Sequence, residues 1–587
     1  MSALSNTIQT AVHEASAGRP DKAKDLLRRL LQRSPTDPAV LKALAEVHAS
    51  LGEREQAALF IRRAAAGSPR DVGLRFQAGE MLLGLGRAKE AEAEFAECNR
   101  LAPGELAPYN RRVRALLALG QDDRAGEVSE RSITLMPDRV EAYWQWFSLL
   151  AKIGRIEEAV AVCRRGLARL PDNPDLLEYL CYLLNYAERV DPHEHLGLHR
   201  RLGEIITRMV PAAAPFTNDR ISDRPLRVAF LSGDICAHAC AFFLAGVIGN
   251  LDRNRVTPVL YANNPPDATT INFGGIALLR HVNDLSDDQL SSLVRQDAID
   301  ILVECNGWTG RHRLRAVARR LAPVQVTYLG YPNTTGLAAV DARIVDGFTD
   351  PPGAEAWATE RLVRLPGCFL TYTIPAQAPP PRSSGYVERG EGGPTFVSFN
   401  RVTKMTPGLL GLWARVVRET PGSRLLFKTD ALPGAEREAR RKWEHAGGEP
   451  GALAFTPFEP DPARHLAAYS MGDVALDPFP YNGTTSTLEA LQMGVPVVSL
   501  VGDQHRSRVG ASLLSAVGLA DLIARDEKDY IRLARELAGD RARLAALHAT
   551  LRDRLVSSPV CDGASYARRF EDALAALWRN WCERSGA

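Results

Sequence analysis

The chain lacks an excess of charge of either sign: 72 Lys and Arg residues stand against 70 Asp and Glu residues, a formal net charge of +2 over 587 residues. This balance provides no overall field that would draw the protein onto a phosphate backbone or an acidic lipid surface. We therefore expect no nucleic-acid partner. The length corresponds to about four domain-sized units at roughly 150 residues each, which excludes a single compact core.

Export and membrane signals are scarce as well. The first residues contain neither the basic segment nor the apolar run of a signal peptide. The uncharged stretch 235–251 is shorter than the roughly 20 residues that a membrane-spanning helix needs. We expect a cytoplasmic protein without a membrane span.

The nine cysteines include no CxxC pair, which favours free thiols in a reducing compartment over a disulfide framework. Cys236, His238 and Cys240 form the one cluster that suggests a metal site, but no fourth ligand lies nearby in the sequence. We expect packed thiols here and no metal or other cofactor.

A strict repeat of 34 residues organises the N-terminal third of the chain. Glycines, alanines and prolines recur in three registers with this period: Gly18, Gly52, Gly86, Gly120 and Gly154; Ala23, Ala57, Ala91, Ala125 and Ala159; Pro35, Pro69, Pro103, Pro137 and Pro171. Glycine permits the turn between two helices, alanine lets them approach, and proline ends the second one. The pattern resembles tetratricopeptide repeats and predicts an α-solenoid over residues 1–190.

Such a solenoid usually presents a concave surface to a peptide or a protein segment. We therefore expect a protein partner, the alternative being a structural spacer or a homodimerisation arm. Residues 191–224 are predicted to form capping helices and a linker. His193, His195 and His199 are interpreted as polar faces of these helices and not as metal ligands.

From residue 225 onward, short apolar strands alternate with helices, which is typical of doubly wound parallel sheets. Strands are predicted in two series: 226–232, 257–262, 299–305, 324–329 and 342–345, then 395–399, 424–428, 453–456, 474–476 and 495–500. A segment rich in Pro, Gly and Ser, 375–393, separates the series. The predicted fold is thus α plus α/β, with one lobe at 225–388 and a second at 389–587, and ligands are expected at loops that follow strands.

The most informative loop is 477–487, which joins a strand to a helix expected to start near Thr485. Gly483 is followed by the hydroxyl residues Thr484, Thr485, Ser486 and Thr487. A helix N-terminus with free N–H groups and several hydroxyls suits a diphosphate, whereas helix capping alone needs fewer hydroxyls. Glu489, one turn further, is placed to accept hydrogen bonds from sugar hydroxyls.

Two further post-strand loops contain candidate site residues. Asn400, Arg401 and Lys404 follow the first strand of the second series, where a lysine could neutralise a leaving diphosphate. His238 follows the first strand of the first series. It is either a group that touches the acceptor or moves a proton, or a loop histidine with an ordinary structural partner.

Six ordered motifs now support a family resemblance. They lie at 226–234 with His238, 300–309, 329–336, 398–400 with Lys404, 483–486 and 507–509. Together they resemble the O-linked N-acetylglucosamine transferase family, whose members join tetratricopeptide repeats to a two-lobed GT-B catalytic region. The short 375–393 segment resembles bacterial members.

The resemblance implies a role for each matching residue. Lys404 would hold the donor diphosphate and stabilise the departing nucleotide, with Thr484, Thr485 and Ser486 on the phosphates. Glu489 would bind the ribose, His465 would stack on the nucleobase, and His238 would lie near donor and acceptor. The motifs also place Asn306, Tyr331 and Pro332 in loops on the acceptor side of the cleft.

The implied reaction is an inverting, metal-independent transfer of a sugar, most simply N-acetylglucosamine from UDP-N-acetylglucosamine, to Ser or Thr hydroxyls of a protein.

Several positions depart from the family pattern. Ala468 replaces an arginine that helps bind uracil, and Arg401 replaces a phosphate-contacting glutamine. The asparagines that line the family's repeat array are replaced by Ala43, Gln77, Arg111 and Gln145. These departures motivate an alternative, a flagellin glycosyltransferase that uses a CMP-nonulosonic acid of the pseudaminic type. A third hypothesis is a repeat scaffold with an inactive transferase module.

Overall fold

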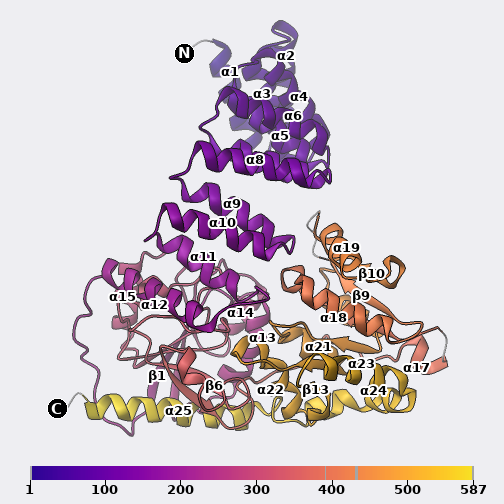
Figure 1. The fold of residues 1–587 in the computed structure, drawn as a ribbon. Helices are drawn as coiled ribbons and strands as arrows, with labels where there is room; N and C mark the ends of the chain where they lie inside the picture. Colours follow the sequence, from indigo (N-terminus) through magenta and orange to yellow (C-terminus); the bar gives the residue numbers. More distant parts are fainter. Residues whose placement is uncertain (1–2, 390–391, 430–433, 585–587) are drawn as a thin grey trace. The chain divides into compact units, whose positions relative to one another are not determined.

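The computed structural model describes residues 3–389, 392–429 and 434–584 (Figure 1). Contacts divide the chain into two compact units. One comprises Met1–Leu149 with Ala168–Leu170, and the other comprises Leu150–Leu167 with Pro171–Ala587. The division falls inside the fifth repeat, earlier than the predicted end of the solenoid at residue 190.

Antiparallel helix pairs build the first unit. They are α1 (Ala3–Ser16), α2 (Pro20–Arg33), α3 (Pro38–Ser50), α4 (Arg54–Gly67), α5 (Val72–Gly84), α6 (Ala88–Leu101), α7 (Leu106–Ala118) and α8 (Asp122–Leu135); α9 (Val140–Lys152) and α10 (Ile156–Arg169) span the division. All five turn glycines have φ between 74° and 87°, which L side chains rarely adopt. The repeat alanines are fully or almost fully buried. The predicted repeat is therefore confirmed.

The second unit continues with α11 (Pro174–Leu184) and α12 (Pro192–Met209). His195 and His199 on α12 are buried, so the prediction that they form a polar face is wrong. His195 Nε2 donates to the Cys181 carbonyl at 2.9 Å, and His199 Nε2 lies 2.9 Å from the Tyr331 hydroxyl. Burial lowers the pKa of both rings, which favours neutral imidazoles that hold the solenoid cap on the first lobe.

The first lobe contains a seven-stranded parallel sheet in the order β3-β2-β1-β4-β5-β6-β7. Its strands are β1 (Leu226–Ser232), β2 (Val256–Ala262), β3 (Leu278–His281), β4 (Ile301–Glu304), β5 (Val324–Thr327), β6 (Ala342–Asp346) and β7 (Arg361–Leu365). The predicted five form the centre. The missed strands, β3 and β7, are the edges, and both carry arginine instead of a continuous apolar run.

The second lobe contains a six-stranded sheet in the order β10-β9-β8-β11-β12-β13. Its strands are β8 (Thr395–Ser398), β9 (Arg424–Lys428), β10 (Leu453–Thr456), β11 (Val474–Leu476), β12 (Val497–Leu500) and β13 (Ile523–Ala524). All five predicted strands are present. The two-residue β13 is too short to leave a sequence signal.

Helices cover both sheets. In the first lobe they are α13 (Ala239–Gly249), α14 (Ala268–Phe273), α15 (Asp287–Gln296) and α16 (Leu314–Val317). Those after the linker are α17 (Gly385–Arg389), α18 (Pro407–Arg418), α19 (Ala435–His445), α20 (Pro462–Ala467), α21 (Thr485–Gln492), α22 (Val509–Ala516), α23 (Glu527–Gly539), α24 (Arg541–Val556) and α25 (Gly563–Arg584). Among the described residues, none of these helices is long and apolar enough to cross a membrane.

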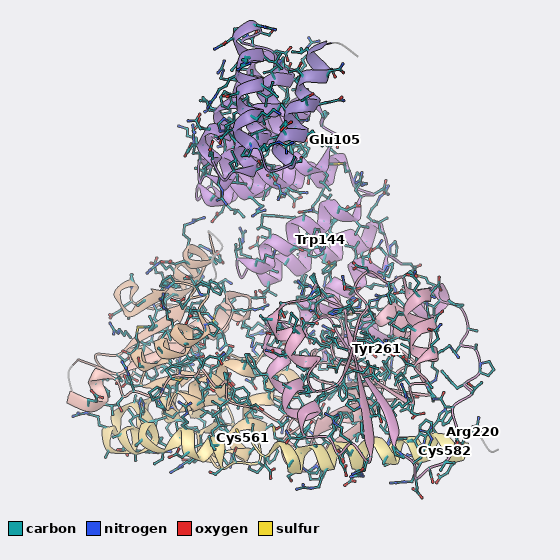
Figure 2. All side chains as sticks on the ribbon, turned by 180° about the vertical axis from the view of Figure 1, so that it is seen from behind. Glu105, Trp144, Arg220, Tyr261, Cys561 and Cys582 are labelled. Atoms are coloured by element: carbon teal, nitrogen blue, oxygen red, sulfur yellow. The ribbon has the colours of Figure 1, made fainter. Side chains whose placement is uncertain are left out.

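The C-terminal helix α25 packs against the first lobe, although the domain prediction assigned its residues to the second. Phe570 lies 5.4 Å from the Tyr328 ring, and Trp578 donates to the Ile221 carbonyl at 3.2 Å. Figure 2 shows Arg220 of the linker beside the Cys582 end of α25, where the guanidinium lies 5.0 Å from the Trp581 ring. By these contacts the helix belongs to the first lobe, although it follows α24 of the second lobe in the chain.

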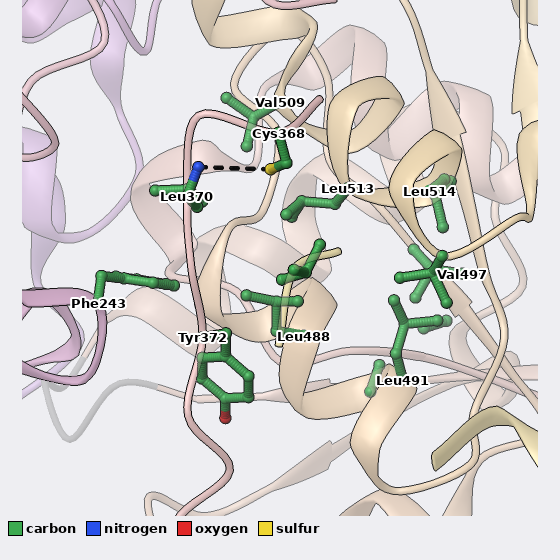
Figure 3. Close-up of a cluster of buried hydrophobic side chains, with 14 of the residues drawn as sticks. Phe243, Cys368, Leu370, Tyr372, Leu488, Leu491, Val497, Val509, Leu513 and Leu514 are labelled. Atoms are coloured by element: carbon green, nitrogen blue, oxygen red, sulfur yellow. Dashed lines mark hydrogen bonds between the residues drawn. The ribbon is translucent and has the colours of Figure 1, made fainter. Parts of the chain in front are cut away.

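Apolar side chains of both lobes form one buried cluster with those of α21 (Figure 3). Phe243 of α13 lies 5.9 Å from the ring of Tyr372, whose hydroxyl donates to Gln492 Oε1 at 2.9 Å. Leu488 and Leu491, on the buried face of α21, are fully buried in the same cluster. This packing fixes α21, whose N-terminus forms part of the candidate site.

Candidate active site

Asp477 stabilises the loop between β11 and α21 through two hydrogen bonds. Its carboxylate accepts hydrogen bonds from the Gly483 N–H at 2.6 Å and from the Ser499 hydroxyl at 2.5 Å. Helix α21 begins at Thr485, as predicted, and Thr484 occupies the N-cap position without a side-chain capping hydrogen bond. The hydroxyl of Thr484 therefore does not cap the helix, and the first N–H groups of α21 can serve an anion.

Lys404, Asn400 and Ser486 come together beside this helix start. Lys404 closes a short 3-10 helix, η2 (Val402–Lys404), directly after β8. Its ammonium donates to the Asn482 carbonyl at 2.7 Å and to Asn400 Oδ1 at 3.2 Å, and Ser486 donates to the same Oδ1 at 2.9 Å. The Tyr481 ring lies beneath the ammonium, 4.5 Å from centroid to Nζ.

Burial lowers the pKa of Lys404 to about 8, an effect that nearby Arg401 reinforces and the Asp477 carboxylate opposes. Burial likewise raises the pKa of Asp477 to about 6. Burial is the main cause that lowers the pKa of His238, and the charge of Arg401 adds to it, so this charge acts on residues of both lobes. Two cationic side chains next to a helix N-terminus form a site suited to a compact, doubly charged anion.

One turn into α21, Glu489 lies next to His465. Glu489 Oε2 is 3.2 Å from His465 Nε2 and accepts from the Tyr469 hydroxyl at 3.2 Å. The Phe399 ring lies 4.6 Å from Tyr469 and 6.1 Å from His465. The predicted ribose and nucleobase residues are therefore neighbours, with an aromatic layer around them.

In the first lobe, His238 pairs with Asp234. The imidazole Nδ1 accepts from the Cys240 N–H at 3.3 Å and lies 3.6 Å from Asp234 Oδ2. Burial raises the pKa of Asp234 and lowers that of His238, while each group's charge opposes the shift of its neighbour. Sequence reasoning did not assign Asp234 a role, although its i, i+4 spacing to His238 was a usable signal.

Asn306, predicted as a cleft residue, is buried and hydrogen-bonded to the loop that carries Asp234 and His238. Its amide donates to Asp234 Oδ2 at 2.9 Å and accepts from the Gly233 N–H at 2.7 Å. It therefore fixes the loop that bears Asp234 and His238.

Asp234, His238 and Cys240 offer three possible metal ligands within 4.8 Å of one another. Burial raises the pKa of the Cys240 thiol strongly, and this thiol is hydrogen-bonded to Asp234.

An apolar pocket of about 310 Å³ adjoins His238. It lies between α13 and α14, and its walls include Phe242, Ala245, Phe273 and Ile276. Sequence reasoning did not find it, because its walls are ordinary helix residues.

Tyr331 and Pro332 lie in the packing between the first lobe and the last helices of the solenoid. The Tyr331 ring is buried, and its hydroxyl accepts from the Asn185 amide at 2.9 Å and donates to the Cys181 carbonyl at 3.1 Å. Tyr331 thereby joins α11 and α12 to the first lobe, which differs from its predicted place facing the acceptor. Pro332 follows it and is partly buried.

The chain is similar to known proteins over most of its length. It is 37% identical over 417 residues to the tomato protein named probable UDP-N-acetylglucosamine--peptide N-acetylglucosaminyltransferase SPINDLY, a match covering 68% of this chain and 44% of the relative. It is 23% identical over 472 residues to the Caenorhabditis elegans UDP-N-acetylglucosamine--peptide N-acetylglucosaminyltransferase, covering 61% and 41%. The chain thus matches less than half the length of these relatives.

A solved structure of a mutant Thermobaculum terrenum O-GlcNAc transferase aligns over 100% of both chains, with a TM-score of 0.70 and 29% identity. Tetratricopeptide-repeat models match residues 14–78 and 140–183, which suggests protein binding by this region. The model of glycosyl transferase family 41 matches residues 190–373 and 390–570, which include both lobes with Lys404, His238 and the start of α21. The chain therefore belongs to glycosyl transferase family 41.

Proposed function

We propose that the protein is a protein O-glycosyltransferase that transfers a sugar from a nucleotide sugar, most simply N-acetylglucosamine from UDP-N-acetylglucosamine, to Ser or Thr hydroxyls of a protein in the cytoplasm. The observation that supports this most directly is the convergence of Lys404, Asn400 and Ser486 at the start of α21. Family membership and the names of the relatives agree with it.

In the proposed reaction, the acceptor hydroxyl attacks the anomeric carbon from the face opposite the diphosphate and inverts it. The bond from that carbon to the diphosphate oxygen breaks, and its electron pair leaves with the nucleotide. Lys404, Arg401 and the first N–H groups of α21 stabilise this charge, which is the role that a divalent cation has in other transferases. The acceptor's proton passes to the Asp234–His238 pair.

His465 and Glu489 would contact the nucleobase and the ribose of the donor, and the repeat array would bind the acceptor protein. Incubation of purified protein with labelled UDP-sugars and cell proteins tests the proposal. Transfer of label by the wild type, lost in Lys404→Ala, would support it. Capture of a partner protein without any nucleotide binding would instead support an inactive scaffold.

A second candidate is a flagellin glycosyltransferase with a CMP-nonulosonic acid donor. It is favoured by Ala468, which lies between His465 and Tyr469 and offers no polar side chain beside the proposed nucleobase site. Calorimetric titration with UDP, CMP, GDP and ADP distinguishes the candidates. Tight binding of UDP alone supports the first, and tight binding of CMP alone supports the second.

A further inference from the structure

We propose that the end of the solenoid is a built-in part of the diphosphate site: the Gly154 turn of the fifth repeat and the Tyr186–Tyr481 ring pair position Lys404. This assignment rests on the proposed role of Lys404 with the donor diphosphate. Three separate sets of contacts within the second unit lead from the repeat to this lysine.

The first set holds the backbone of the η2 segment. A Cβ at Gly154 would lie 2.9 Å from Val402 Cγ1 and 3.1 Å from the Val402 carbonyl, so the turn packs directly on the residue two positions before Lys404. The buried ammonium of Lys442 donates to the Gly154 carbonyl at 2.5 Å and to the Met405 carbonyl at 3.0 Å. The turn and η2 are thus joined on both sides of Lys404.

The second set of contacts positions the Lys404 ammonium against an aromatic ring. Tyr186, just after α11, is buried, and its ring lies 4.9 Å from that of Tyr481. Tyr481 in turn lies 4.5 Å from Lys404 Nζ. A cation over a ring face is attracted by the negative face of the ring, so a Tyr481 ring held in place by Tyr186 fixes the ammonium.

The third set runs through Arg506. Its guanidinium is buried and donates to the Leu184 and Asn185 carbonyls, both at 2.7 Å, at the end of α11. Its backbone carbonyl accepts from the Asn482 N–H at 2.8 Å. The Asn482 carbonyl then accepts from Lys404 at 2.7 Å. A displacement of the end of α11 therefore reaches a hydrogen-bond partner of the lysine.

The repeat provides a matched pair of variants. Gly154 and Gly86 occupy the same turn in two of the repeats with φ of 87° and 75°, but a Cβ at Gly86 would meet nothing within 4 Å. Alanine at either position carries the same kind of backbone strain, because L side chains rarely adopt a positive φ. Only Gly154→Ala also displaces Val402.

We expect Gly154→Ala to lower the turnover number about tenfold and Gly86→Ala to leave it unchanged, because small displacements of a catalytic group are costly. In a Lys404→Ala background, Gly154→Ala should have no further effect, since it acts through the lysine. Equal losses for both glycine variants, or a full additional loss in the Lys404→Ala background, would overturn the proposal.

A second measurement needs neither donor nor acceptor, so its outcome is independent of the proposed function. The pH dependence of acetylation of Lys404 by acetic anhydride, read by peptide mass spectrometry, reports the pKa of this lysine, one of nine in the chain. The wild-type midpoint is expected at about 8. Tyr186→Ala removes the ring that packs on Tyr481 and lets solvent approach Lys404. Because burial is the main cause of the low pKa of this lysine, we expect the midpoint to rise by about 1 pH unit.

Tyr186→Phe keeps the ring and should restore the wild-type midpoint. Asp477 and Arg401, the charges that act on Lys404 in the described part of the chain, are present in every variant. Acetylation of Lys442, the buried lysine of α19, reports general loosening of the fold. An unchanged Lys404 midpoint in Tyr186→Ala, or an equal rise at Lys442, would overturn the proposal. Failure of sugar transfer with a shifted Lys404 midpoint would instead count against the proposed function alone.

Discussion

Ser486 donates a 2.9 Å hydrogen bond to Asn400 Oδ1, an oxygen that also accepts from Lys404. The two residues come from different strand-to-helix connections of the second lobe, after β8 and after β11, which are adjacent strands. The carboxyl ends of parallel strands meet at one edge of a sheet, and ligands bind there. This bond therefore places the lysine and the helix start at one ligand site.

Replacement of Lys404 by alanine removes the ammonium proposed to face the departing diphosphate. We expect kcat to fall about 100-fold or more, because stabilisation of leaving-group charge is a large term in such transfers. Lys528→Ala provides the control, since Lys528 is exposed on α23. Steady-state transfer assays on both variants check the prediction, and unchanged activity in Lys404→Ala would remove the lysine from the mechanism.

The low pKa of Lys404 predicts a basic limb in the pH profile. The ammonium is the form that attracts the diphosphate, and its folded-state pKa is about 8, below the ordinary lysine value of 10.5. Activity that depends on the charged form is thus complete well below pH 8 and declines as the pH rises through this value. The dependence of kcat/KM on pH reports the free enzyme and is the relevant measurement. A flat profile up to pH 10 would contradict the prediction.

The Asp234–His238 pair can be tested without disturbing helix α13. His238 is the N-cap of α13 through Nδ1, and asparagine is itself a good N-cap residue. We expect His238→Asn and Asp234→Asn each to lower kcat about 100-fold, with the free energy of unfolding changed by less than about 1 kcal/mol. Transfer kinetics with urea unfolding of the same samples separate the effects. Loss of stability in proportion to activity would indicate a structural role.

Tyr331 is expected to act on stability alone. Tyr331→Phe removes the hydroxyl that pairs with Asn185, Cys181 and His199, which leaves buried polar groups without this partner. We expect the free energy of unfolding to fall by about 1–3 kcal/mol. Turnover of the folded variant should remain at the wild-type level. A large fall in kcat at unchanged stability would return Tyr331 to the acceptor side of the cleft.

Most of the architecture could be predicted because its signals are local. The 34-residue period fixes the helix pairs, and the continuous apolar runs of the central strands mark both sheets. The missed strands β3 and β7 are edges with arginines, and β13 has two residues. The packing of α25 on the first lobe depends on contacts such as Phe570 with Tyr328, which no local pattern encodes.

The candidate site could be predicted where one strand end supplies the residue, as for Lys404, Asn400 and Ser486. It could not be predicted where residues far apart in the chain act together. Tyr186 and Tyr481 pair across the second unit, and Asn306 reaches Asp234 from another strand. Tyr331 was placed by its motif, but a motif does not tell which way a side chain points, and here it points into buried structure.

Mass spectrometry of protein after incubation with the purified chain and UDP-N-acetylglucosamine tests the central claim most directly. We expect N-acetylhexosamine on Ser or Thr residues with the wild type, and none with Lys404→Ala under the same conditions. Absence of any modified Ser or Thr with the wild type, whichever nucleotide sugar is supplied, would contradict the claim.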